Sequence, residues 1–235
     1  MVKKVGLIIQ AHMGSTRLPG KVMKKVNGIS VLGHVIMRLK RVKHADMIIV
    51  ATSTLPVDDV IIEESENYGA VVYRGDNEDV LSRYYEAAKK YGITDIARIC
   101  SDNMFVDPDI IENEIEYFLN HDYSLVTSGK TVPLGLGTEV FSFGDLEEAN
   151  QKAMSSYEHE HVTPYIYEHG KVYYCELDCN YGKYRLTLDT AEDWQLVNAV
   201  ASKLDSVRCS LGDIIGVLEE NPDFYELNRN VKQRS

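Results

Sequence analysis

Short apolar segments alternate with amphipathic helical segments through the first half of the chain. The hydrophobic pattern predicts strands at residues 5–10, 47–51, 70–73, 95–100 and 124–128, and helices at residues 31–42, 57–68, 79–91 and 108–119. Ser30 is expected to cap the first helix, Asp76 or Asn77 the third, and Asp107 the fourth. Repeated strand–helix units imply a mostly parallel sheet covered by helices on both sides, so the expected fold class is α/β.

The alternation breaks between about residues 130 and 176. Glycines punctuate short strand-like pieces there, and helices are expected at 145–154 and 157–169. We interpret 130–176 as an inserted segment within a single domain of residues 1–235. The pattern then resumes with a strand at 184–188, a helix at 191–204 and a last helix capped by Ser210.

The charge is distributed unevenly along the chain. The first 45 residues hold ten Lys or Arg and no acid, whereas the whole chain carries a net charge of -11. The acidic total argues against a general nucleic-acid binder, so no nucleic-acid partner is expected. The basic segment, however, could hold a small polyanion.

Membrane and secretory features are not expected. No apolar run approaches the roughly 18 residues of a membrane span, and Lys3, Lys4 and Arg17 bracket the first apolar run without a signal-peptide pattern. We therefore expect a cytoplasmic protein without a membrane partner. Its four cysteines are expected to be reduced, because Cys175 and Cys179 would lie about 13 Å apart on a strand, too far for a disulfide.

A glycine-rich basic loop follows the first expected strand, with the sequence GSTRLPGK over residues 14–21. Backbone N–H groups in such a loop can point at phosphate oxygens, Arg17 can bind two oxygens at once, and Lys21 adds a point charge. The spacing matches neither a Walker A loop nor the dinucleotide GxGxxG fingerprint. The loop is therefore predicted to bind phosphate, and the alternative is a surface turn with incidental charges.

Two aspartates follow later strands: Asp102 comes after the strand at 95–100, and Asp189 after the strand at 184–188. Carboxyl ends of parallel strands share one crevice, so the two side chains can converge on one Mg²⁺. That ion takes its remaining ligands from phosphates and water, which suits a nucleoside triphosphate. The alternative is that both aspartates only cap helices.

Two other patterns have simpler explanations. His159 and His161 would point about 200° apart on a helix, which disfavours a shared transition metal. Asp107 and Asp109 form a DxD pattern, but they fit a helix N-cap and first turn better than a glycosyltransferase metal site.

Five segments, in this order, carry a family resemblance: IIQAHMGSTRLPGK, YRGDNEDVLSRYYEAAKKYG, RICSDNMFVDPDII, EHVTPYI and YRLTLDTAEDW. Together they resemble the cytidylyltransferase family of spore coat polysaccharide biosynthesis protein F, a group similar to the CMP-Kdo and CMP-acylneuraminate synthetases. The resemblance runs from about residue 5 to residue 200. The ordered set is far more specific than any one segment.

The resemblance implies a Rossmann-like, GT-A-like nucleotidyltransferase domain built as a three-layer sandwich. It implies a Mg²⁺-dependent transfer of CMP from CTP to an acidic or otherwise modified sugar, with release of pyrophosphate, for cell-surface polysaccharide biosynthesis. The implied partners are CTP, a sugar acceptor and a second copy of the chain, with the inserted segment serving acceptor binding and dimerisation.

The resemblance also implies roles for individual residues. Those expected to contact the nucleotide are Gln10, Ala11, His12, Gly14, Ser15, Arg17, Lys21, Arg74, Ser82 and Asp102. Asp102 and Asp189 would hold the metal, and Glu139, His161 and Tyr165 would face the acceptor. Arg17 and Lys21 would be catalytic because they stabilise charge on the leaving pyrophosphate, and Asp102 because it would hold the metal ion.

The sequence departs from the family pattern at two places. His12 stands where the family loop usually reads QARMGS, so a fixed cation is replaced by a group that titrates near neutral pH. Ser101, Asn103 and Met104 replace the usual TGDCP pattern around Asp102. Two alternatives stay open: a GT-A-like glycosyltransferase with a nucleotide-sugar donor, and a CTP-binding homologue without activity.

Overall fold

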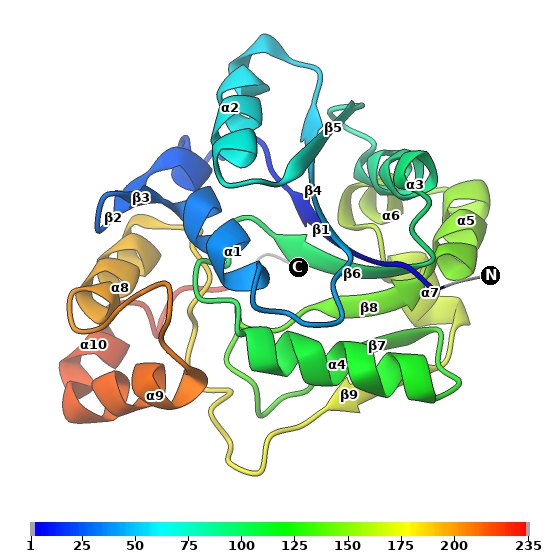
Figure 1. Cartoon of the computed structure of the whole chain (residues 1–235). Helices are drawn as coiled ribbons and strands as arrows, with labels where there is room; N and C mark the ends of the chain where they lie inside the picture. The colour runs from blue at the N-terminus through cyan, green and yellow to red at the C-terminus, as the bar shows by residue number, and fades with distance from the viewer. Residues whose placement is uncertain (1–2, 234–235) are drawn as a thin grey trace.

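The computed structural model describes residues 3–233, and its centre is a seven-stranded sheet (Figure 1). The spatial order of the strands is β5-β4-β1-β6-β8-β7-β9. They span β1 (Val5–Gln10), β4 (Met47–Ser53), β5 (Val71–Gly75), β6 (Asp95–Cys100), β7 (Leu125–Ser128), β8 (Glu139–Ser142) and β9 (Val172–Cys175). Within the described sheet only β8 runs antiparallel to its neighbours, β6 and β7. A separate short hairpin pairs β2 (Lys25–Val26) with β3 (Ile29–Ser30).

Helices cover both faces of this sheet, as the strand–helix pattern predicts. One face packs against α1 (Val31–Leu39), α2 (Asp59–Asn67) and α4 (Pro108–Asn120). The other packs against α3 (Val80–Tyr91), α5 (Phe143–Lys152) and α7 (Pro164–His169). Alternate residues of β1 divide between the two cores, with Leu7 and Ile9 on one side and Ile8 on the other. The predicted α/β three-layer fold is confirmed.

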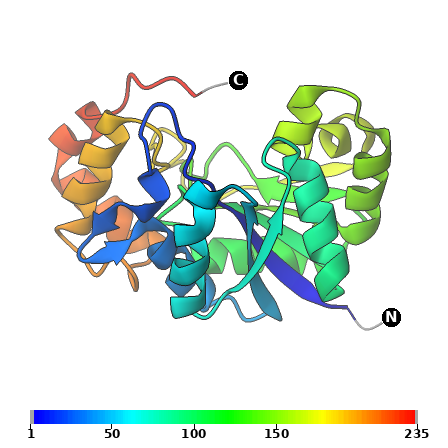
Figure 2. The same cartoon turned by 90° about the horizontal axis from the view of Figure 1, so that it is seen from above.

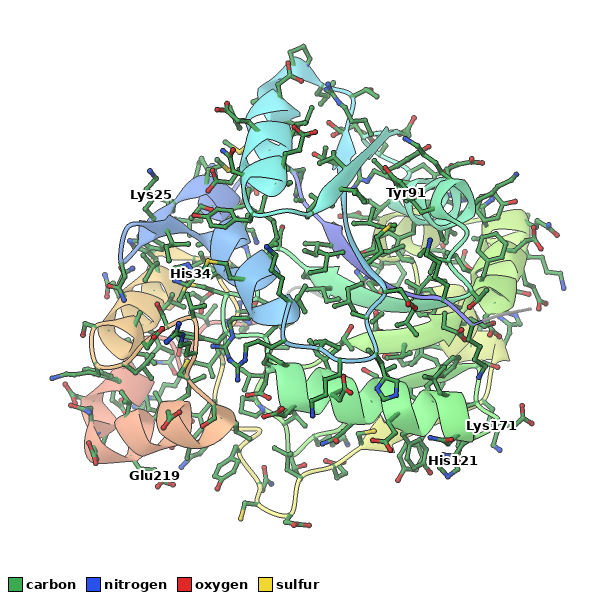
Figure 3. All side chains as sticks on the ribbon, in the orientation of Figure 1. Lys25, His34, Tyr91, His121, Lys171 and Glu219 are labelled. Atoms are coloured by element: carbon green, nitrogen blue, oxygen red, sulfur yellow. The ribbon has the colours of Figure 1, made fainter. Side chains whose placement is uncertain are left out.

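A third core joins the C-terminal helices to the sheet domain. It contains α8 (Ala191–Ala201) and α9 (Leu211–Glu220), next to α10 (Pro222–Glu226), and it includes Met104 and Phe105 after β6. The buried His34, labelled in Figure 3, ties α1 to this region: its ring nitrogens lie 2.9 Å from Ser30 O and 2.9 Å from Ser206 Oγ.

Most predicted helix starts are confirmed, because their caps are local. Ser30 accepts the Gly33 N–H at 2.8 Å, and Asp107 accepts the N–H groups of Asp109 and Ile110. The cap expected at Asp76 or Asn77 is wrong: Asp79 caps α3 by accepting the Ser82 N–H at 2.8 Å. The cap lies three residues after Asp76, and the helix starts at Val80, because Asp76 instead accepts the Glu78 and Asp79 N–H groups in the preceding turn.

Two other expected elements differ in the structure. The helix expected at 157–169 is two helices, α6 (Ser156–His161) and α7, because Val162 has a φ of 71° and Pro164 lacks the N–H that a continuous helix needs. The strand expected at 184–188 is an extended segment outside the sheet. Its hydrogen bonds go to Leu134 and to Asp102 O, and a single bridge pairs Arg185 with Leu134.

The segment 130–176 contributes to the sheet itself. It supplies β8, β9, α5, α6 and α7, and β8 lies between β6 and β7. In Figure 2 the loop that follows β1 lies on the same upper side of the molecule as α5–α7 and the C-terminal tail. All four cysteines are free thiols, as predicted. Between residues 3 and 233 no helix has the length and apolar content needed to cross a bilayer.

Candidate active site

The basic loop after β1 and the two predicted aspartates meet at one point. Lys21 Nζ lies 2.6 Å from Asp102 Oδ2 and 2.7 Å from Asp189 Oδ1. Arg17 Nη2 lies 3.2 Å from Asp189 Oδ2. The Leu188 N–H donates to Asp102 O at 3.0 Å, which holds the two acidic segments side by side. The aspartates, 87 residues apart in sequence, therefore share one cleft with the basic loop.

Arg185 and Asp193 hold Asp189 in place. Arg185 Nη2 donates to Asp189 Oδ2 at 2.9 Å, and its guanidinium also donates twice to the fully buried Asp193. Asp193 in turn accepts the backbone N–H groups of Asp189 and Thr190 at the start of α8. Asp189 is therefore held at two points: Arg185 binds its carboxylate, and Asp193 binds its backbone N–H.

These contacts set the charges of the cluster. Burial tends to lower the pKa of the Lys21 ammonium, but Asp102 and Asp189 raise that pKa above its ordinary value. Burial also favours a neutral Asp189, yet Lys21 and Arg17 hold the pKa of this carboxyl below its usual range. Lys21 and Asp189 are therefore both ionised at neutral pH.

Asp102 and Asp189 fit a hard divalent cation. They already converge on one cation, the Lys21 ammonium, and both supply the carboxylate oxygens that Mg²⁺ prefers. Among residues 3–233, no three His, Cys, Asp or Glu side chains group closely enough to hold a metal ion. Two carboxylates converge here, and Mg²⁺ is usually held by one or two carboxylates with phosphates and water as its other ligands.

A cavity of about 580 Å³, here called the nucleotide cavity, opens beside the loop. Four residues predicted from the β1 end and its loop line it, namely Gln10, Ala11, His12 and Gly14. Its opposite wall comes from the turn before α3, from α3 and from α6, including Asp79, Arg83 and His159. His159 Nδ1 lies 2.9 Å from Asp79 Oδ1, so α6 contacts the start of α3 within this wall. The volume is in the range of small-molecule sites.

Six predicted nucleotide residues lie outside the lining of this cavity. Arg17, Lys21 and Asp102 belong to the charged cluster described above, and the other three are Arg74, Ser82 and Ser15. Arg74 Nη2 forms an ion pair with Asp59 at 2.8 Å, and Arg74 also donates to the backbone oxygens of Ser53 and Leu55. Arg74 thus supports the Leu55 segment, which does line the cavity. Ser82 sits in the first turn of α3, and Ser15 Oγ accepts the Leu18 N–H within the loop.

A second cavity of about 490 Å³, here called the acceptor cavity, lies between β6, β8, α6 and α7. Glu139 and His161, which the resemblance assigns to the acceptor, line it. Gln10 connects the two cavities: its Oε1 accepts from Arg98 Nε at 3.2 Å and Nη2 at 3.0 Å, and Arg98 Nη1 donates to Glu139 at 2.5 Å. His161 lines both cavities.

Tyr165 does not face the acceptor cavity. It is buried in the core beneath α7, and its hydroxyl lies 3.5 Å from Glu148 on α5. The expectation of an acceptor contact at Tyr165 is therefore corrected. Two positions along α7, Tyr167 lines the cavity and donates to Glu139 Oε1 at 2.9 Å. The break at Val162 and Pro164 sets which residues of α7 face the cavity and which face the core.

The comparison with known families decides the assignment. A family model described as cytidylyltransferase matches residues 7–228. The chain belongs to the cytidylyltransferase family. The predicted family is confirmed. Membership in this family makes the chain a nucleotidyltransferase that uses CTP.

Relatives match this cytidylyltransferase over nearly its whole length. An uncharacterized protein of Methanocaldococcus jannaschii is 40% identical over 97% of this chain and 96% of its own. The spore coat polysaccharide biosynthesis protein SpsF of Bacillus subtilis is 32% identical over 92% of this chain and 94% of its own. A solved cytidylyltransferase from Leptospira borgpetersenii is 32% identical, covers all of both chains and superposes with a TM-score of 0.90.

Several site residues of this cytidylyltransferase were not predicted from the sequence, Arg185 and Tyr167 among them. Arg98 is a charged residue between the apolar residues Ala97 and Ile99 of β6, which is a signal in itself. Asp193 stands three residues after Thr190, the spacing of a capping box. Asp58 and Arg83 give no such local signal; Asp58 accepts the Met13 N–H at 2.7 Å and so holds the loop.

Proposed function

We propose that the protein transfers CMP from CTP to a sugar, acidic or otherwise modified, and releases pyrophosphate. The observation that supports this most is the convergence of Arg17, Lys21, Asp102 and Asp189 beside the nucleotide cavity. The proposed roles of the individual site residues, the Mg²⁺ requirement and a place in cell-surface polysaccharide biosynthesis belong to this proposal.

In the proposed reaction a sugar hydroxyl attacks the α-phosphorus of CTP, and pyrophosphate leaves. The backbone of Gln10 and Ala11 borders the cytosine, while Arg17 and Lys21 bind the β- and γ-phosphates and stabilise charge on the leaving group. Asp102 and Asp189 would hold Mg²⁺, which when bound neutralises phosphate oxygens. The acceptor would enter from the side of Glu139 and His161.

We further propose that the enzyme is a homodimer formed through the segment 130–176. This segment ends in β9, the outermost strand of the sheet, and Tyr174 on that strand is exposed. An outer strand leaves one row of backbone groups without a sheet partner. Analytical ultracentrifugation tests the proposal, and a mass of one chain at micromolar concentration would contradict it.

CTP labelled at the α-phosphate tests the transferase directly. We expect the label to pass to a sugar, with one pyrophosphate released per transfer, only when Mg²⁺ is present. Release of UDP or GDP from a nucleotide sugar would instead support the glycosyltransferase alternative. CTP binding without transfer to any acceptor would support an inactive homologue.

A further inference from the structure

The two carboxylate oxygens of Asp189 have different partners. Oδ2 accepts from Arg185 Nη2 at 2.9 Å and lies 3.2 Å from Arg17 Nη2, whereas Oδ1 lies 2.7 Å from Lys21 Nζ. Because the Arg185 guanidinium holds Oδ2, Oδ1 is the oxygen that meets the ammonium shared with Asp102. The position of Arg185 therefore decides how Asp189 meets a cation in the cleft.

Gln233 completes the hydrogen bonds of the Arg185 guanidinium. Nε and Nη2 donate to the two carboxylate oxygens of Asp193, at 2.9 Å and 3.1 Å, and Nη1 donates to Gln233 Oε1. Among the described hydrogen bonds, Gln233 is the sole partner of Nη1. A planar guanidinium that is bound through all three nitrogens cannot rotate without breaking one of these bonds.

Asn228 fixes the backbone of the same arginine. Arg185 lies in the extended segment outside the sheet, where the neighbouring residues on both sides of it pair with the backbone of Leu134. The Arg185 carbonyl accepts instead from Asn228 Nδ2 at 2.9 Å, and the same amide group donates to Asp193 Oδ1 at 2.8 Å. Asn228 is 2% exposed, so its NH₂ group uses both donors inside the protein. Asn228 thus ties the backbone of Arg185 to the carboxylate that the Arg185 side chain binds.

Both residues belong to the C-terminal segment 228–233, which follows α10. Figure 2 shows the chain returning from the C-terminal helices along the side of the molecule on which the loop after β1 lies. Every described hydrogen bond or ion pair that joins this segment to residues before α10 goes to Arg185 or Asp193. The polar contacts of the segment with the rest of the fold are thus contacts with the residues that hold Asp189.

We propose that the C-terminal segment 228–233 is part of the active site, in which Asn228 and Gln233 position Arg185 so that Asp189 offers Oδ1 to the metal ion. The inference rests on the proposed function, which gives Asp189 its metal role, and it adds two residues to the site. Both are positioning residues, because they act through Arg185 and Asp193. Partners that orient a metal ligand in this way typically contribute a factor of about 10 to 100 in metal affinity or activity.

Metal binding tests the inference without any turnover. Electron paramagnetic resonance titration of Mn²⁺ in the absence of nucleotide measures the affinity, and Asp102→Ala identifies the ion that binds in the cleft. We expect Mn²⁺ to bind about tenfold more weakly to Gln233→Ala and to Asn228→Ala than to the natural protein. Gln233 is exposed, so Gln233→Ala decides the matter even if Asn228→Ala, at a buried position, does not fold. Lys232→Ala, at the exposed neighbouring position, is the control, and an unchanged affinity in Gln233→Ala would overturn the inference.

The side-chain signal of Arg185 reports its position with neither metal nor nucleotide. In heteronuclear NMR its Nε–H group, which donates to Asp193, is expected to exchange slowly with water in the natural protein. Exchange should become faster in Gln233→Ala and return toward the natural rate in Gln233→Glu, which keeps an oxygen for Nη1. An equal exchange rate in all three proteins would contradict the inference.

Turnover separates positioning from a general loss of structure. With Mg²⁺ limiting, pyrophosphate release by Gln233→Ala should fall about tenfold, and saturating Mg²⁺ should restore it, because a weakened site still fills at high concentration. A merely structural defect would lower the rate at every Mg²⁺ concentration, and that result would count against a positioning role.

The inference and the proposed function fail in different ways. If the variants consume CTP like the natural protein and keep its Mn²⁺ affinity and its Arg185 signal, only the inference is wrong. If the natural protein consumes CTP with no sugar, the proposed transfer is wrong, and the Mn²⁺ affinity and the Arg185 signal still decide the inference.

Discussion

Lys21 is the residue on which the charges of the site converge. Its ammonium lies within 2.7 Å of both Asp102 and Asp189, in the position between two carboxylates that a divalent cation would take. Asp189 is itself held by Arg185, so it cannot simply turn away from the lysine. When a metal–triphosphate complex binds, the ammonium is expected to exchange the aspartates for phosphate oxygens.

Lys21→Ala is expected to reduce kcat on the order of 10² to 10³-fold, because the variant loses a cation that stabilises charge on the leaving pyrophosphate. Asp102→Ala should have a loss of similar size. Steady-state pyrophosphate release measures both, and Lys203→Ala, in the exposed turn after α8, is the matched control. Near-normal kcat in Lys21→Ala or Asp102→Ala would contradict the role given to that residue.

Lys21→Met should also change metal binding in the absence of nucleotide. The methionine keeps the length of the side chain but removes the competing charge between the aspartates. We expect Mn²⁺ to bind about tenfold more tightly to Lys21→Met than to the natural protein, equivalent to about 1.4 kcal/mol. Electron paramagnetic resonance titration of free Mn²⁺ measures the affinity, with Lys203→Met as control. An affinity that does not rise would show that the lysine does not compete with the ion.

At the scale of elements, local signals allowed most helices and strands to be predicted. Side-chain caps such as Ser30 and Asp107 accept N–H groups two or three residues away, so helix starts can be predicted from the local sequence. The prediction of a strand at 184–188 was wrong because an alternating pattern indicates an extended backbone but not whether a neighbouring strand is free to pair with it. Its backbone instead pairs with Leu134, on the loop before β8.

The packing of α4 on β7 and β8 buries one carboxyl group. Glu114 is fully buried, accepts from the Ser128 hydroxyl and accepts the Thr138 N–H at 3.0 Å. Burial raises the pKa of Glu114 to about 8, although both hydrogen bonds tend to lower it. The folded protein therefore keeps this carboxyl protonated in a pH range where an unfolded chain ionises it.

The pH dependence of stability follows with a definite sign. Between the ordinary value of 4.5 and about 8 the folded state binds the extra proton, so the free energy of unfolding decreases as pH rises through this window. The slope from Glu114 is at most about 1.4 kcal/mol per pH unit. Glu114→Gln can donate to Ser128 and accept from Thr138 without titrating, so its unfolding curve should lose this slope. Urea unfolding from pH 5 to 8 measures it; identical slopes would refute the assignment.

At the scale of the whole molecule, the position of Asp102 was predictable, but Asp189 reaches it from an extended segment outside the sheet, and most of the residues around them were not predictable. The carboxyl ends of parallel strands meet at one edge, and this rule placed Asp102 beside the β1 loop. The ion pair between Arg98 and Glu139 forms because β8 lies antiparallel beside β6. No local sequence pattern predicted this position of β8. The break before α7 likewise decides that Tyr167, and not Tyr165, faces the cavity.

Because CTP binds a cleft that several distant segments form together, it should stabilise the whole fold. A ligand that binds only the folded state, at 100 times its dissociation constant, adds about 2.7 kcal/mol to the free energy of unfolding. For a chain of this size that amounts to a rise in Tm of roughly 5–10 °C. We expect the rise with CTP and Mg²⁺ to exceed those with UTP, ATP and GTP.

Differential scanning fluorimetry with each triphosphate at equal concentration, with Mg²⁺ or with EDTA, measures this stabilisation. Lys21→Ala should reduce the rise with CTP, because its ammonium binds phosphate, whereas Lys203→Ala should not. An equal rise in Tm with all four triphosphates would show that the cavity binds the phosphates without selecting cytosine. A rise with CTP that persists in EDTA would show that CTP binding does not require the metal.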